Sequence, residues 1–271
     1  MRRLLPLFSI LLVSLSVAQD HDHGLRWLPN QTLMPAFTAN ATSHRISLVH
    51  LLKDNEYIGS MGGLFPVVSA DIAGHETQFN AGATAYTQLN RSGRHTQVST
   101  IDYFVDLLAD VDLRQGRVLR LGVGHTSQHF VDDAFEVLGY RSAINYVRDY
   151  VEAFYSQRLA LIRGYLYGGF LYHYRFVIPQ PGKYHWLFEV GGEGLHYELA
   201  RNVYAYAALD IKLREEAGYG TTQNYQLGIR LNGEGGRTIR LAYAYRTGLE
   251  ERGQFYRDRI HWNTIGLFFE F

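Results

Sequence analysis

Apolar and polar residues alternate over long stretches of this chain, and the alternation restricts the fold more than any other feature of the sequence. In residues 203–214, valine, alanine, leucine and isoleucine occupy one side of an extended chain, while most residues on the other side are tyrosine or charged. Residues 101–113 repeat this design with aspartates along the polar side. Since successive side chains of a β-strand point to opposite faces, the pattern predicts an all-β fold.

The alternating segments are long enough to cross a membrane as tilted strands, for which ~9–11 residues suffice. Aromatic residues gather at their ends, as is typical of strands that cross a bilayer. The sequence therefore predicts an antiparallel transmembrane outer-membrane β-barrel of about 12 strands at residues 44–271, with its apolar side chains facing lipid. The expected strands are 45–52, 57–68, 78–89, 100–113, 117–128, 143–156, 161–174, 184–197, 203–214, 221–231, 237–247 and 259–271.

The two ends of the chain indicate where such a barrel resides. Two arginines, an apolar stretch and a small-x-small site predict a signal peptide at residues 1–18, cut after Ala18. The polar segment at residues 19–43 is then expected to lie in the periplasm ahead of the barrel. The final Phe271, with alternating apolar residues behind it, resembles the assembly signal of bacterial outer-membrane barrels. That resemblance implies the bacterial outer membrane as the location and the barrel assembly machinery as a partner.

Composition removes several classes of function. The chain of 271 residues has no cysteine, which excludes disulfides, thiolate metal sites and a cysteine nucleophile. Its formal net charge is zero, with 26 basic and 26 acidic residues, so nucleic acid is not an expected partner. Charges of both signs fall on the lumen side, and we expect ion pairs there rather than a wide pore. Links after even-numbered strands are shorter than several links after odd-numbered ones, such as residues 90–97, which places both termini in the periplasm.

One stretch, VLRLGVGHTSQH at residues 118–129, carries the clearest candidate chemistry. His125 and Ser127 share the side of the strand that also carries its leucines and a valine, which is the side expected to face outer-membrane lipids. A serine hydroxyl becomes a strong nucleophile when a base removes its proton, and imidazole is the usual base. The pair predicts a lipid acyl hydrolase with Ser127 as nucleophile and His125 as base.

A third polar side chain is needed to orient the imidazole. The next expected strand offers two candidates on one face. Asn145, at the outer end of that strand, is the best placed, and Asp149 is the second candidate. The predicted catalytic residues are therefore Ser127, His125 and Asn145.

Two resemblances accompany these residues. His-Thr-Ser followed by RSAINY is similar to the His-x-Ser and Asn arrangement of outer membrane phospholipase A, and the His-x-Ser step also resembles the lipid A deacylases. This implies a twelve-stranded barrel with a lipid-facing serine hydrolase site, although the interval between Ser127 and Asn145 is longer than in those enzymes. Over nearly the whole mature chain, LPNQTLMP, HTSQHFVDDAF, ALDIKLREE and GQFYRDRIHWNTIGLFFEF resemble domain-of-unknown-function family 1207 of Gram-negative outer-membrane proteins, which implies the barrel but no activity.

Other interpretations of the same residues stay open. A bulge at Gly122 or Gly124 would turn His125 and Ser127 into the lumen. There they would be ordinary hydrogen-bonded groups, or would join a metal-binding loop with His129, Asp132 and Asp133. The alternative function is a non-enzymatic barrel, structural or for passage of small solutes, and a surface adhesin is more distant. No cofactor is expected with certainty; calcium is the ion that the phospholipase resemblance raises, and the sequence shows no match for its ligands.

Overall fold

The computed structural model describes residues 24–53, 56–92, 95–131, 133–134, 144–178 and 183–270. Within these residues, thirteen strands form one antiparallel sheet. They are β1 (Arg26–Trp27), β2 (Ile46–Leu51), β3 (Glu56–Ile72), β4 (His75–Ser92), β5 (His95–Asp112), β6 (Arg117–Phe130), β7 (Tyr146–Leu159), β8 (Gly164–Val177), β9 (Trp186–Ala200), β10 (Val203–Arg214), β11 (Gly220–Asn232), β12 (Thr238–Leu249) and β13 (Arg259–Glu270). No helix of the described part is long and apolar enough to cross a membrane. The predicted signal peptide and Phe271 lie outside these residues.

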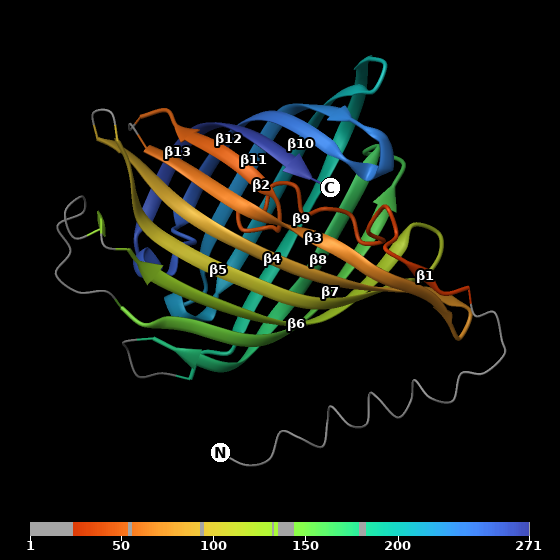
Figure 1. Cartoon of the computed structure of the whole chain (residues 1–271), viewed down its shortest axis with the longest axis horizontal. Coiled ribbons are helices and arrows are strands. Elements are labelled where there is room, and N and C mark those ends of the chain that lie inside the picture. Colours follow the sequence, from red (N-terminus) through yellow and green to blue (C-terminus); the bar gives the residue numbers. More distant parts are fainter. Residues whose placement is uncertain are drawn as a thin grey trace.

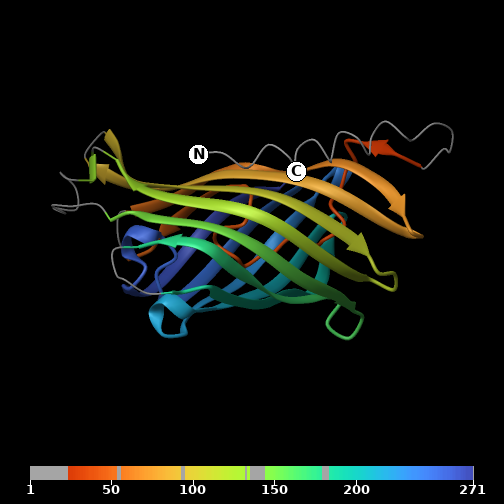
Figure 2. The same cartoon turned by 90° about the horizontal axis from the view of Figure 1, so that it is seen from below.

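Strands β2 to β13 close into a barrel, which confirms the predicted fold (Figures 1 and 2). Each strand pairs with the next along the chain, and the ring is completed where β13 pairs with β2, from Ile46 opposite Phe269 to Leu51 opposite Thr264. The short β1 lies outside the ring and adds to β3. We call the end with the links after β3, β5, β7, β9 and β11 the turn end, and the opposite end the loop end.

The described strands differ from the predicted ones mainly in β3, β4 and β5. The glycine-rich stretch around residue 60 belongs to a 17-residue strand that is longer than the expected 57–68. Its Pro66 is accommodated because the register with β4 shifts between Pro66 and Val68, and a bulge tolerates the missing N–H. The loop expected at residues 90–97 was wrong, since β4 continues to Ser92 and pairs there with His95 of β5.

The two faces of the barrel have opposite character. Outward-facing side chains are apolar and exposed, and they include Leu107, Leu121, Val123, Val190, Leu227, Leu241 and Ile265. Inward-facing side chains are polar or charged and buried, and they include Asp102, Asp106, Asp110, Arg120, Glu189, Glu193, Asp210, Lys212 and Arg240. The predicted ion pairs are present in the lumen: Arg120 Nε lies 2.7 Å from Asp110 Oδ1, and Arg240 Nη2 lies 2.6 Å from Glu270 Oε1.

Residues 31–45, which we call the plug, run through the barrel interior between β1 and β2 (Figure 1, orange-red). The sequence had placed residues 19–43 in the periplasm ahead of the barrel, and the described part of that segment differs from this expectation. The physical reason is complementarity, because the small polar side chains of the plug donate to carboxylates that line the lumen. Asn40 Nδ2 donates to Glu189 Oε1 at 2.8 Å, and the Thr38 hydroxyl donates to Glu193.

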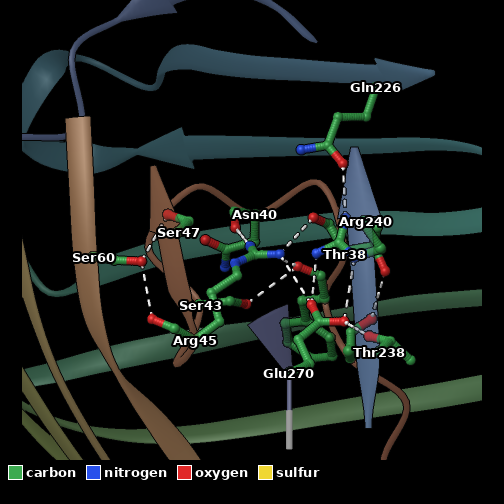
Figure 3. Close-up of polar contacts among 12 residues, drawn as sticks. Thr38, Asn40, Ser43, Arg45, Ser47, Ser60, Gln226, Thr238, Arg240 and Glu270 are labelled. Carbon is green, nitrogen blue, oxygen red and sulfur yellow. Dashed lines mark hydrogen bonds and ion pairs between the residues drawn. The ribbon is translucent and has the colours of Figure 1, made fainter. Parts of the chain in front are cut away.

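The plug is held in different ways near β2 and near its middle. Close to β2, the Arg45 guanidinium donates to the Thr38 and Asn40 carbonyl oxygens and lies 3.3 Å from Glu270 Oε1 (Figure 3). Further from β2, the Phe37 ring stacks on Tyr167 with centroids 3.9 Å apart and an interplanar angle of 4°. Polar and apolar contacts together fix the plug against several strands.

A second segment, residues 250–258, folds into the loop end of the barrel, and we call it the cap. Arg252 donates to Gln88 of β4 and to Glu250 of the cap itself. Gln254 bridges the backbones of β6 and the segment before β7, through the carbonyl oxygens of Gln128 and Ile144 at 3.0 and 2.8 Å. Plug and cap meet at Lys212, whose Nζ donates to Asn40 Oδ1 at 3.0 Å and to Glu251 Oε1 at 2.5 Å.

Candidate functional site

The structure places His125 and Ser127 on the outward face of β6, as the alternation predicts. Both side chains are half-exposed, in line with the exposed Leu121 and Val123. The ladders of β6 with β5 and with β7 run through this region without a register shift. The interpretation that a bulge turns the pair into the lumen is therefore wrong.

Packing in the lumen explains why glycines precede the pair without bending the strand. A side chain at Gly124 would collide with Asp106 and Tyr150, and one at Gly122 would collide with Leu108 and lie 2.9 Å from Glu152. The glycines leave room for large inward-facing side chains of β5 and β7. They are a consequence of a crowded interior rather than a sign of irregular backbone.

The orienting partner of His125 is Asp149 on β7. The two residues stand directly opposite each other, and His125 Nδ1 lies 2.5 Å from Asp149 Oδ1. The His125 side chain is 45% exposed and the Asp149 side chain only 16%, so the carboxylate is partly shielded while the imidazole edge remains open. With Nδ1–H donating to the carboxylate, Nε2 is left as the acceptor, which is the tautomer that a general base requires.

Asn145, the first choice of the sequence analysis, does not occupy this position. It lies just before β7 and is exposed, and Gln128 pairs with its neighbour Tyr146. Asn145 is four residues from Asp149, or about 13 Å along an extended strand, which is beyond hydrogen-bonding reach of His125. The register between β6 and β7, which residue spacing alone could not supply, gives the orienting position to Asp149.

A cation that the sequence analysis missed lies beside Asp149. Together, His125, Asp149 and this cation form a line of polar side chains across three neighbouring strands, which we call the row. Arg175 of β8 stands opposite Asp149, with Nη1 3.4 Å from Asp149 Oδ2, and its side chain is 68% exposed. The β7–β8 register shifts here, because Tyr150 pairs with His173 whereas Asp149 pairs with Arg175. His173 is buried in the lumen, and residues two apart in a regular strand share a face. Strict alternation would therefore have pointed Arg175 into the lumen as well. The bulge at Tyr174 turns it outward, and no pattern in the sequence announces that bulge.

The surroundings of this row are apolar on the side nearer the middle of the barrel. Ser127 stands between Tyr103 of β5 and Val147 of β7. The next outward positions toward the turn end are Leu107, Val123 and Val151, all exposed. A hydroxyl, an imidazole, a carboxylate and a guanidinium thus border a continuous apolar surface, which is a suitable setting for a lipid ester.

The described residues contain no group of three or more histidine, aspartate or glutamate side chains that could hold a metal ion. Of the proposed metal-binding loop, Asp132 lies outside the described part. The Asp133 carboxylate accepts a hydrogen bond from the Val98 N–H at 3.1 Å, so it serves the loop end of β5. Calcium therefore has no preformed carboxylate cage among the described side chains.

The lumen offers a second polar region. A cavity of about 720 Å³ follows the plug and is lined by Arg120, Arg148 and Glu152 among others. Most of the charged groups around the plug are already paired, as in the Arg45, Arg240 and Glu270 cluster of Figure 3. This cluster anchors β13 to the plug, and we assign it to stability of the barrel.

The fold can be compared with solved structures. The outer membrane phospholipase of Salmonella typhi, solved as a dimer with bound calcium, is similar with a TM-score of 0.50 and 13% sequence identity, over 84% of this chain and 90% of that one. Outer membrane phospholipase A of Escherichia coli gives a TM-score of 0.49 and 13% identity, over 84% and 96% of the two chains. At this identity the first likeness shows a shared outer-membrane barrel fold.

At the level of sequence, no curated protein matches the chain significantly. A family model described as "Protein of unknown function (DUF1207)" matches residues 35–271, from the plug to the end of the last strand. Since that match spans the whole barrel, the chain belongs to the DUF1207 family.

Proposed function

We propose that this protein is an outer-membrane lipid acyl hydrolase that acts on phospholipid or lipid A at its outward surface. The observation that carries the proposal is the 2.5 Å contact between His125 and Asp149 on the outward face, two residues from a serine. Polar groups on the lipid-facing side of a membrane barrel are costly unless they lie near the interface. A paired imidazole and carboxylate beside a hydroxyl on that side are best explained by chemistry on lipids.

The reaction follows from the roles of the three side chains. His125 Nε2 takes the proton of the Ser127 hydroxyl as its oxygen attacks the ester carbonyl of the lipid. Asp149 accepts the Nδ1–H bond and stabilises the imidazolium that forms. The imidazolium then protonates the departing alcohol, which leaves an acyl ester on Ser127. Water attacks this ester as His125 takes its proton, and His125 returns the proton to the Ser127 oxygen as the fatty acid leaves. In the described structure no hydrogen bond joins Ser127 to His125, and such bonds often tighten only when substrate is bound.

The proposal is tested by lipid hydrolysis with the refolded protein and its Ser127→Ala variant. We expect wild type to release fatty acid from phospholipid or lipopolysaccharide micelles, and Ser127→Ala to lose about 10⁴-fold or more of that activity. Because the similar Salmonella typhi structure holds bound calcium, each assay is run with calcium and with a chelator.

A matched control and a covalent probe sharpen this test. Ser156→Ala, on the lumen face of β7, should leave hydrolysis unchanged. An organophosphorus probe should label wild type and Ser156→Ala but not Ser127→Ala. Folded wild-type barrel that neither releases acyl groups nor reacts with the probe would contradict the proposal.

The alternative function is a structural barrel without catalysis. It is favoured by the filled interior, since the plug and the cap meet at Lys212 within the lumen. That filling argues against free passage of solutes, and it is equally compatible with an enzyme whose site lies outside. The labelling experiment separates the two functions.

A further inference from the structure

Arg175 is an exposed cation on the outward surface of a barrel whose outward surface is otherwise mainly apolar. Its only described partner is Asp149, at 3.4 Å, and the same carboxylate is already engaged by His125 at 2.5 Å. At 3.4 Å the guanidinium contact is weak, and most of the five N–H donors of an arginine remain free. Arg175 can therefore bind a further anion without breaking the contact that orients His125.

The backbone of β8 is deformed at this point. The register shift between Asp149 and Tyr150 of β7 leaves Tyr174 of β8 without an opposite residue and brings Arg175 to the outward face. Bulges commonly redirect a side chain next to an active site. The bulge places Arg175 in the row that contains Asp149 and His125, across three neighbouring strands.

Aromatic side chains fix the depth of this row relative to a bilayer. Tyr172 of β8 and Trp186 of β9 stand opposite each other on the outward face, with ring centroids 5.0 Å apart. The ring centroid of Trp186 in turn lies 5.7 Å from that of Phe188. Tyrosine and tryptophan gather where membrane hydrocarbon meets headgroups, and Arg175 lies beyond Tyr172 toward the loop end. Its guanidinium is therefore at the level of lipid headgroups.

We propose that Arg175 binds the phosphate group of the lipid that is cleaved at Ser127, so that the substrates are phosphate-bearing lipids. This inference rests on the proposed function, since it assigns the headgroup side of the same site. Arginine matches phosphate oxygens with paired N–H donors. Arg175 and His125 are separated by one strand, so their Cα atoms are roughly 10 Å apart. Because both side chains are flexible, the guanidinium and the imidazole can approach each other until their separation matches the distance between the phosphate and the acyl ester of one lipid.

The direct test is lipid binding in the Ser127→Ala background, where no substrate is consumed. Native mass spectrometry of the detergent-solubilised barrel would compare phosphatidic acid with diacylglycerol of the same acyl chains. We expect selective binding of phosphatidic acid, weakened roughly tenfold by Arg175→Gln. Arg91→Gln is the matched control, because Arg91 is another exposed arginine at the loop end, on β4. Inorganic phosphate at equal concentration should not displace the lipid.

The kinetic test separates this inference from the proposed function. With active protein, Arg175→Gln should raise KM for a phosphate-bearing ester and leave hydrolysis of a phosphate-free ester unchanged, and Arg175→Lys should recover part of the loss. Hydrolysis with unaltered phosphate preference in Arg175→Gln would overturn the role of Arg175 and leave the hydrolase standing. Wild type without hydrolysis would overturn the hydrolase, while Arg175-dependent phosphatidic acid binding would still support the phosphate site.

Discussion

The pairing of His125 with Asp149 decides what the imidazole can do. A carboxylate fixed at Nδ1 leaves Nε2 for a proton acceptor role and favours the charged imidazole that forms during attack. An amide at the same position would orient the ring but would not balance its charge. The anionic partner therefore favours a general base at His125 over a merely structural histidine.

Two substitutions at the residue scale distinguish the candidates for this partner. Asp149→Ala should lower kcat for lipid ester hydrolysis by about 10²-fold or more, because His125 loses its orienting acceptor. Asn145→Ala should leave kcat within about twofold, since Asn145 lies too far along the strand to reach the imidazole. Steady-state hydrolysis of a micellar ester measures both. A loss confined to Asn145→Ala would return the orienting role to that residue.

The limits of the sequence are visible at these same positions. The alternation of apolar and polar residues was enough to predict that His125 and Ser127 face outward, because side chains of a regular strand alternate between its two faces. The partner on the next strand depended on a register that is set by long-range pairing, and so Asn145 was preferred to Asp149. The outward direction of Arg175 depended on a bulge, which interrupts the alternation of side chains between the two faces. Local pattern thus predicted the faces of the strands but not which residues meet across them.

At the scale of elements, the plug is the part that strand periodicity could not reveal. Its residues have no alternation, so they read as a loop outside the barrel. Their placement is determined by partners distant in sequence, such as Glu189 and Glu193 of β9. Buried carboxylates need hydrogen-bond donors, and the plug supplies them from threonine, asparagine and arginine. These carboxylates lie far from the plug in sequence, so no local pattern indicates that the plug pairs with them.

Removing an aromatic anchor should loosen the plug. Phe37 packs on Tyr167 and lies 5.0 Å from the Phe154 ring, so Phe37→Ala should lower the free energy of unfolding by about 2–3 kcal/mol. The comparison is Leu25→Ala, an exposed position ahead of the plug, with an expected change within about 0.5 kcal/mol. Urea titration of both refolded variants in detergent measures the difference. Equal stabilities would show that the plug contributes little to the fold.

The cap gives the protein an acid-sensitive element at Glu251. Burial alone would raise the pKa of this carboxyl, but the Lys212 ammonium and the Arg246 guanidinium hold it below its ordinary value of 4.5. A depressed folded pKa stabilises the fold fully above the ordinary pKa, and that stabilisation is lost as the pH falls through the folded pKa. At neutral pH, Glu251→Gln should therefore be less stable than wild type by about 3 kcal/mol.

That difference should shrink toward zero as the pH falls below the ordinary value of 4.5 and through the lowered folded-state pKa of Glu251, because wild type then loses the same charge. Unfolding free energies of both proteins across this range, in one detergent, provide the measurement. A difference that does not change with pH would mean that the Glu251 charge has no part in holding the cap.

For the whole molecule, the fold separates an interior occupied by the plug and the cap from an outward face that carries the proposed site. Cross-strand pairs in the lumen, the plug and the cap hold the wall rigid, and rigid strands position outward side chains more accurately than loops do. The interior therefore supports the proposed outward site by stabilising β6, β7 and β8. A barrel whose lumen is occupied in this way is expected to pass few ions.

We expect wild-type protein in planar bilayers to show little conductance, because the plug and the cap occupy the lumen from opposite ends and meet at Lys212. Replacing residues 31–43 by a glycine–serine segment of equal length keeps the chain continuous but removes the plug side chains that occupy the lumen. Conductance of this variant should rise severalfold if it folds, which circular dichroism of the refolded protein establishes. The cap would still narrow the loop end, so the increase should be smaller than for an open pore of this size. High conductance from wild type itself would mean that the plug leaves the lumen in a membrane, and would restore the small-solute channel as the function.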